Sequence, residues 1–118
     1  MFALMHMICF VNMPEFEWQR TVIELLHVYR YKVCEFRKAR VKKDGEDVYR
    51  TPFGADGKGM TDLIATRPGR VLFIENKSDT GKQSWEQIEW MELLLQCPGI
   101  EYYLSRPKDY DKLVEEWR

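Results

Sequence analysis

The strongest constraint on the fold is a pair of short apolar stretches separated by a turn. Residues 61–66 read TDLIAT, residues 70–77 read RVLFIENK, and Arg67-Pro68-Gly69-Arg70 links them. Both stretches are rich in residues that favour strands, and Pro-Gly favours a tight turn. The second stretch contains a continuous apolar run, Leu72 to Ile74, of the kind found in buried strands. The sequence therefore predicts an antiparallel β-hairpin within the core.

Patterns on either side of this hairpin supply the rest of the fold. A helix is predicted from Pro14, and a second helix from Ser84 to the Pro98-Gly99 stop. We also expect a strand over residues 31–41, a Gly-rich loop over 42–60 in which Asp44-Gly45 favours a hairpin turn, a strand over 100–105 and a last helix over 107–118. The predicted order is αβββαβα: one α/β domain over residues 14–118, with a mixed central sheet flanked by helices.

Residues 1–13 are expected to form an apolar N-terminal arm. They lack the basic start and the small-residue cleavage site of a signal peptide, and they are too short to span a bilayer. We therefore predict no membrane association. A short strand or packing arm is the expected structure, with self-association of the chain as the alternative.

Composition excludes some classes of protein. The three cysteines are far apart and form no CxxC pair, which argues against a zinc site and a disulfide framework and favours a reducing, intracellular setting. The 18 basic and 19 acidic residues give a net charge of −1. Overall charge therefore does not indicate nucleic-acid binding, although a local basic surface remains open.

Charged residues cluster at the predicted ends of the two hairpin strands. Glu75 and Lys77 are two residues apart and so lie on one face of a strand, while Asp62 opens the partner strand and can lie near Glu75. Two close carboxylates repel unless one is protonated or a cation lies between them. Carboxylates favour Mg²⁺ or Mn²⁺ as that cation. The alternative is an ordinary surface ion pair between Glu75 and Lys77.

Each of the first two predicted helices adds one polar residue near its apolar stripe. Glu15 lies at the edge of the first stripe, where it faces inward or serves the helix dipole. Gln87 lies on the apolar face of the second helix, three residues after Ser84. It can form a capping box or bond to a partner in the core, and we expect one amide to fill only one of these roles.

This set of residues can support phosphodiester hydrolysis. A metal bound by the two acids would polarise a phosphoryl oxygen and lower the pKa of a bound water. Lys77 could orient that water or neutralise charge in the transition state.

Four segments together resemble the PD-(D/E)xK nuclease superfamily, and more closely its virus-type replication-repair nuclease (VRR-NUC) family. They are PEFEWQ, GMTDLIA, VLFIENK and GKQSWEQIEWMELL. The resemblance implies a restriction-endonuclease-like core and a Mg²⁺- or Mn²⁺-dependent endodeoxyribonuclease. It also implies a role in DNA repair or recombination, in the cytoplasm of a bacterial or phage-infected cell.

The resemblance also assigns roles to individual residues. Asp62, Glu75, the backbone carbonyl of Asn76 and the first-helix acid Glu15 match metal ligands, with Glu17 as the fallback for Glu15. Lys77 matches the catalytic lysine, and Gln87 matches the family's helix glutamine. Two positions depart from the family pattern: Thr61 replaces a frequent proline, and Asn76 replaces a hydrophobic or small residue. The Asn76 side chain should face away from the site.

A basic stretch suggests how DNA would be held. Phosphate contacts are expected from six residues, although interspersed acids leave a plain solvated loop as the alternative. The six are Arg37, Lys38, Arg40, Lys42, Lys43 and Lys58.

Stand-alone members of the family are similar to dimeric Holliday-junction resolvases, so we expect a homodimer acting on branched double-stranded DNA. The N-terminal arm, Tyr102, Tyr103 and Trp117 are candidate interface residues. Alternatives are a flap- or nick-directed nuclease, an inactive DNA-binding accessory module and a plain interaction domain.

Overall fold

The predicted central hairpin is confirmed. The computed structural model describes residues 12–36, 39–50 and 54–118. Strands β4 (Leu63–Arg67) and β5 (Arg70–Asn76) pair antiparallel in a register that places Leu63 opposite Ile74. The tight turn between them has Gly69 at a φ of 89°, a conformation that glycine adopts without strain.

Two further strands complete a mixed four-stranded sheet. Strand β1 (Lys32–Glu35) pairs antiparallel with β4, and β6 (Glu101–Ser105) pairs parallel with β5. The strand order is β1-β4-β5-β6. The parallel pair requires a crossover, which helix α3 (Trp85–Leu94) provides. The expectation of a mixed sheet flanked by helices is therefore confirmed.

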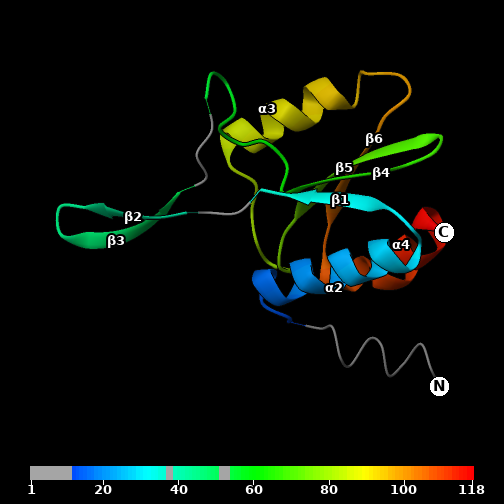
Figure 1. The fold of residues 1–118 in the computed structure, drawn as a ribbon, viewed down its shortest axis with the longest axis horizontal. Helices are drawn as coiled ribbons and strands as arrows, with labels where there is room; N and C mark the ends of the chain where they lie inside the picture. Colours follow the sequence, from blue (N-terminus) through cyan, green and yellow to red (C-terminus); the bar gives the residue numbers. More distant parts are fainter. Residues whose placement is uncertain (1–11, 37–38, 51–53) are drawn as a thin grey trace.

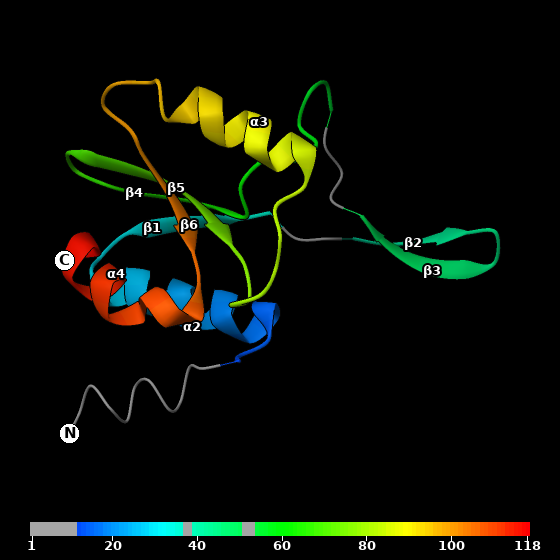
Figure 2. The ribbon, with the colours of Figure 1, turned by 180° about the vertical axis from the view of Figure 1, so that it is seen from behind.

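The main hydrophobic core lies on one face of the sheet. Helices α2 (Glu15–Val28) and α4 (Tyr110–Trp117), the latter preceded by the short 3₁₀ helix η1 (Pro107–Asp109), cover this face, whereas α3 lies on the opposite face (Figures 1 and 2). Alternate residues of β4 and β5 point into the core. Its buried members are Trp18, Val22, Leu26, Tyr31, Leu63, Ala65, Leu72, Ile74, Leu113 and Trp117.

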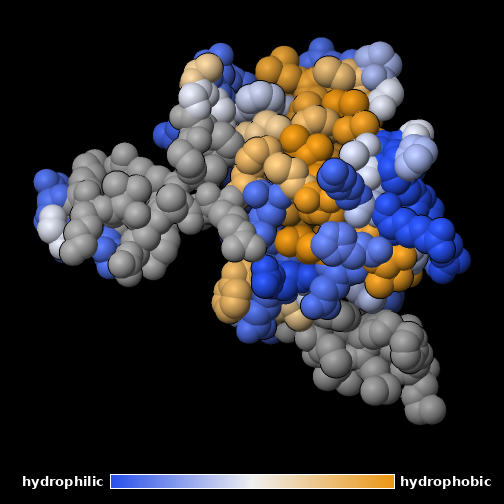
Figure 3. Space-filling model, in the orientation of Figure 1, coloured by the Kyte–Doolittle hydropathy of each residue, from blue (hydrophilic) through white to orange (hydrophobic). Residues whose placement is uncertain are grey.

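The α3 face is covered less completely. Within α3 only Leu94 is buried, whereas Trp85, Leu93 and the following Leu95 are each more than half exposed. In Figure 3 hydrophobic residues gather over α3 and the strands beside it. The sheet therefore has one well-packed face and one face with apolar surface in contact with solvent.

The prediction of a single strand over residues 31–41 is wrong. Strand β1 ends at Glu35, and β2 (Ala39–Lys43) belongs to a separate two-stranded sheet with β3 (Glu46–Arg50). The Asp44-Gly45 turn explains the difference, because positive φ angles of 52° and 81° suit a tight hairpin. Residues 39–43 therefore pair with the next segment of chain, and this hairpin projects from the body of the molecule (Figure 1).

The prediction that Trp117 belongs to a dimer interface is also wrong. Trp117 is fully buried, and Tyr103 packs edge-on against its ring at a centroid distance of 5.5 Å. Tyr102 is half-buried, and its hydroxyl accepts a hydrogen bond from Gln83. The proposed N-terminal arm lies almost entirely outside the described residues. Within the described ranges, no helix has the length and apolar character needed to cross a membrane.

Candidate active site

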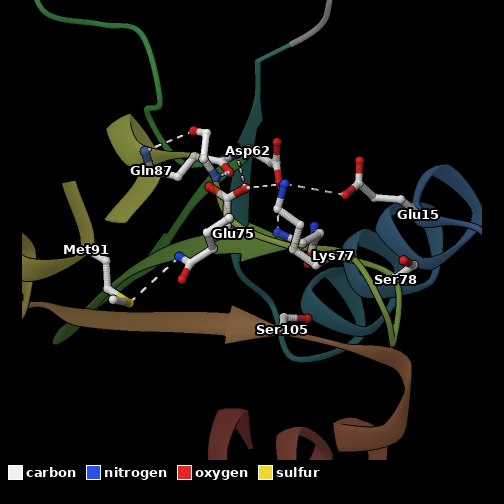
Figure 4. A network of polar contacts seen from close by, with 12 residues as sticks. Glu15, Asp62, Glu75, Lys77, Ser78, Gln87, Met91 and Ser105 are labelled. Carbon is white, nitrogen blue, oxygen red and sulfur yellow. Dashed lines mark hydrogen bonds and ion pairs between the residues drawn. The ribbon is translucent and has the colours of Figure 1, made fainter. Parts of the chain in front are cut away.

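The structure brings Asp62 and Glu75 together at one end of the central hairpin. Asp62 immediately precedes β4, and Glu75 is the penultimate residue of β5. An Asp62 carboxylate oxygen accepts a 2.7 Å hydrogen bond from the backbone N–H of Asn76, which joins the ends of the two strands. The side chains of Asp62 and Glu75 lie next to each other in Figure 4. The predicted approach of the two acids is confirmed.

Glu75 is a buried acid with charged neighbours. Its side chain is 1% exposed, and one oxygen (Oε2) accepts a 2.6 Å hydrogen bond from Gln87. Burial raises the pKa of the carboxyl to about 8, and the nearby Asp62 carboxylate adds to the rise, against the opposing effect of Lys77. At neutral pH a proton or another positive charge is therefore needed to make this arrangement favourable.

Lys77 lies between two acids. Its ammonium nitrogen is 3.8 Å from Glu75 Oε2 and 4.0 Å from Glu15 Oε1, as the dashed lines in Figure 4 mark. The backbone N–H of Lys77 donates to the Ser105 carbonyl, so the position of the residue is fixed by β6. The Arg106 guanidinium holds the loop that follows by donating to the Ser78 and Gly81 carbonyls. Lys77 is therefore held on both sides at the edge of the acid pair.

Gln87 fills both of the roles that we expected to exclude each other. Its amide oxygen accepts from the Ser84 backbone N–H at 2.7 Å, which completes a capping box at the start of α3. Its amide nitrogen donates to Glu75. The expectation of a single role is wrong because the side-chain amide carries a separate acceptor and donor. The start of α3 is thereby coupled directly to the buried acid.

Sequence reasoning missed a second group of polar residues on the other face of β5. The Asn76 side chain is fully buried and donates to Gln19 at 3.3 Å, and Gln19 donates to Glu35 at 2.9 Å. The Asn76 side chain therefore points to the α2 side of the sheet, toward Gln19 at the pocket beside Asp62, so the expectation that it faces away from the site holds only with respect to Glu75. Gln19 follows Glu15 by four residues and so lies on the same helical face, which was the available signal. Nothing local to Glu35 indicated its role.

An open pocket adjoins the acids on the side of α2. Its volume is about 440 Å³. Acidic, aromatic and amide side chains surround it, together with one arginine. The lining residues are Glu15, Phe16, Gln19, Arg20, Glu35, Phe36 and Asp62.

The acid pair meets the chemical requirements of a divalent cation only in part. Asp62 and Glu75 offer the hard oxygen ligands that Mg²⁺ and Mn²⁺ prefer. A cation would also relieve the repulsion that raises the Glu75 pKa. Glu15, however, reaches this pair only through Lys77, and no group of three His, Cys, Asp or Glu side chains with metal-binding geometry occurs among the residues described.

The predicted phosphate contacts are placed only in part. Arg37 and Lys38 lie outside the described residues. Lys42 and Lys43 lie opposite Asp47 and Glu46 in the β2–β3 register. The remaining two residues are Arg40, which lies opposite Tyr49, and Lys58, which forms a 2.9 Å ion pair with Glu86.

The hairpin nevertheless adjoins the site. Phe36, which follows β1 on the way to β2, donates its backbone N–H to the Asp62 carbonyl at 3.0 Å. The end of β1 therefore lies beside Asp62, and the β2–β3 hairpin projects from the body of the molecule in Figure 2.

Comparison with protein-family models, curated proteins and solved structures gave no match for this chain.

Proposed function

We propose that this chain is a metal-dependent endodeoxyribonuclease with a restriction-endonuclease-like core of the VRR-NUC type. The observation that carries the proposal is the buried Glu75 beside Asp62 at the ends of adjacent strands, with the Lys77 ammonium 3.8 Å from Glu75 Oε2. Burying an acid next to another acid is costly for a purely structural purpose. The cost is expected where a site must bind a cation.

Asp62, Glu75 and the backbone carbonyl of Asn76 would hold Mg²⁺ or Mn²⁺. When bound, the metal supplies Lewis-acid activation of the phosphodiester and of a water molecule. Gln87 fixes one Glu75 oxygen, so the carboxylate is oriented before the cation arrives. Glu15 would position Lys77 rather than bind the metal, since its carboxylate lies 4.0 Å from the Lys77 ammonium.

Lys77 would serve the phosphate and the attacking water. The Lys77 ammonium lies at the edge of the acid pair, 3.8 Å from Glu75 Oε2, and would donate to a phosphoryl oxygen of a phosphodiester placed there. There it would stabilise the negative charge that develops during attack. Lys77 is held by backbone contacts at Ser105, so this donation requires only a side-chain movement.

The proposed substrate is branched double-stranded DNA, and the proposed active form is a homodimer that resolves Holliday junctions. Two protomers related by a two-fold axis would present two sites to a two-fold symmetric junction. The projecting β2–β3 hairpin beside each site supports this proposal, because it extends the surface available to a DNA arm. The proposed location is the cytoplasm, in which the exposed thiols of Cys34 and Cys97 would stay reduced.

The decisive test is cleavage of a synthetic four-way junction with Mg²⁺ or Mn²⁺. Asp62→Ala and Lys77→Ala should each lower the cleavage rate by at least about 100-fold, the scale expected for loss of a charge-stabilising group. The exposed acid Glu89 and the exposed base Lys112 supply matched controls, Glu89→Ala and Lys112→Ala. Parent-like cleavage by both site variants would refute the site assignment.

A second measurement separates metal binding from cleavage. Mn²⁺ should raise the melting temperature of the parent and of Glu89→Gln but not that of Asp62→Asn, because a ligand stabilises only the state that binds it. Cleavage of flaps but not junctions by a monomer would retain the metal site and replace the proposed substrate. Branched-DNA binding without any metal-dependent cleavage would favour an accessory module.

A further inference from the structure

The pocket beside the acid pair has a composition that the proposed hydrolysis does not explain. It lies between α2 and the ends of β1 and β4, and it is bordered by Phe16, Phe36 and Gln19 as well as by acids. Phe16 is 70% exposed, so the rim of this polar pocket carries an aromatic face that is open to solvent. An aromatic face in this position can stack on a ligand with a flat surface.

The charge of the pocket restricts the ligand further. Among the described residues that line it, three carboxylates, Glu15, Glu35 and Asp62, face a single arginine, Arg20. A phosphate would be repelled from all but the Arg20 side of this pocket. A neutral group that donates hydrogen bonds is favoured, because carboxylates act only as acceptors.

A nucleobase satisfies both requirements. Its faces stack on aromatic side chains, and the exocyclic amines of cytosine, adenine and guanine donate to carboxylates. Arg20 follows Phe16 by four residues and so lies beside it on α2, where it can contact the phosphate attached to a stacked base. Neither the Phe16 nor the Arg20 side chain has a hydrogen bond or ion pair to another residue in the described part of the chain.

We propose that this pocket receives one unstacked base of the DNA strand that the acid pair cuts. The proposal rests on the proposed nuclease function and deepens it. Asp62 borders the pocket and also belongs to the acid pair, so a base held there lies next to the phosphate to be cleaved. Cleavage would then require a nucleotide that can leave the helix, which branch points supply and continuous duplexes resist.

The test measures binding separately from cleavage. The full-length chain, without Mg²⁺ or Mn²⁺, is titrated into two DNAs of equal length: a continuous duplex, and a branched duplex with 2-aminopurine unpaired at the branch point. The parent should bind the branched DNA more tightly, and the 2-aminopurine fluorescence should rise as the base leaves the stack.

Phe16→Ala should weaken binding of the branched DNA by about 5- to 100-fold, the range that loss of one stacked aromatic produces. It should leave binding of the continuous duplex unchanged. Phe16→Trp should retain the affinity, because tryptophan also stacks. Val28→Ala is the matched control, since Val28 is a similarly exposed apolar residue at the other end of α2.

The outcomes distinguish this inference from the nuclease proposal. Equal affinities of the parent and Phe16→Ala for the branched DNA would overturn the base pocket, even if the parent cleaves that DNA with Mg²⁺. An equal loss of affinity for both DNAs would also overturn it. A Phe16-dependent fluorescence change in a protein that cleaves no DNA would support the pocket and refute the nuclease.

Discussion

At the scale of single residues, Glu75 dominates the behaviour of the site. Its carboxyl is buried, lies beside Asp62 and contacts only one cation, Lys77, within the described residues. The sequence predicted the proximity of these three residues because strand alternation and hairpin pairing are local rules. It could not predict the burial of Glu75, which depends on how α3 and Gln87 close over the strand.

The burial of Glu75 predicts a pH dependence of stability in the metal-free protein. The folded-state pKa of about 8 lies above the ordinary value of 4.5 for a glutamate, so the native state binds the proton more tightly than the unfolded state. The free energy of unfolding should therefore fall as pH rises from about 5 to about 8, by up to about 1.4 kcal/mol per pH unit from this one group. Urea unfolding at several pH values measures this slope.

Glu75→Gln should flatten the slope, because the amide is neutral at every pH in this range. Glu89→Gln, which removes an exposed acid from α3, should keep the slope of the parent. Identical pH profiles for the parent and Glu75→Gln would show that Glu75 does not carry the unfavourable charge.

At the scale of elements, the start of α3 is the point at which folding and the site depend on the same residue. Ser84 accepts from the Gln87 backbone and Gln87 accepts from the Ser84 backbone, while Gln87 also donates to Glu75. Gly59 lies against this turn, where an added Cβ would come within 2.5 Å of the Glu86 backbone carbon. The sequence predicted the helix start from Ser84, but the simultaneous bond to Glu75 follows from the placement of α3 over the sheet.

Two substitutions separate the cap from the contact with Glu75. Ser84→Ala should lower the free energy of unfolding by about 1 kcal/mol and leave junction cleavage close to that of the parent. Gln87→Leu should cause a similar loss of stability and also lower the cleavage rate, since one Glu75 oxygen loses its donor. Chemical denaturation and single-turnover cleavage provide the two readouts. Equal cleavage rates for the two variants would show that Gln87 acts only as a helix cap and that its contact with Glu75 does not contribute to cleavage.

The β2–β3 hairpin is the element that sequence patterns described least well. Residues 31–41 contain no proline or glycine that would mark the end of β1, so propensity alone extended the strand. The choice of partner, with β1 pairing to β4 and β2 to β3, is a property of the assembled sheets. Only the Asp44-Gly45 turn gave a local signal.

Removal of this hairpin should separate stability from DNA binding. Because β2 and β3 form a separate two-stranded sheet among the strands that the structure describes, replacing residues 39–50 with a short Gly-Ser linker should leave the melting temperature within a few degrees of the parent. Affinity for branched DNA should fall, and its dependence on salt should weaken as phosphate contacts are lost. Unchanged affinity and salt dependence would show that the hairpin contacts no DNA.

At the scale of the whole molecule, the site is assembled from segments far apart in the chain. Sequence reasoning found Asp62, Glu75 and Lys77 within 16 residues of each other, and added Glu15 and Gln87 from helical periodicity. It missed Gln19 and Glu35, because their connection to Asn76 depends on α2 lying across β1 and β5. Sequence periodicity predicts on which face of a helix or strand a residue lies. The residues that line a pocket also depend on which helices and strands pack against each other.

The uneven covering of the sheet leads to the last prediction, which concerns assembly. If the active form is a homodimer, the apolar surface of α3 is the part of the described molecule best suited to a partner, because Trp85, Leu93 and Leu95 are each more than half exposed. Leu93→Arg should then convert a dimer to a monomer in sedimentation velocity experiments, without lowering the melting temperature of the folded protomer by more than a few degrees. Val28→Arg, at a similarly exposed position on α2, should remain dimeric.

The monomeric variant should nick junctions on one strand at a time, because only a dimer presents two sites to opposing strands. A parent that sediments as a monomer at micromolar concentration, or a Leu93→Arg variant that remains dimeric, would exclude α3 as the interface.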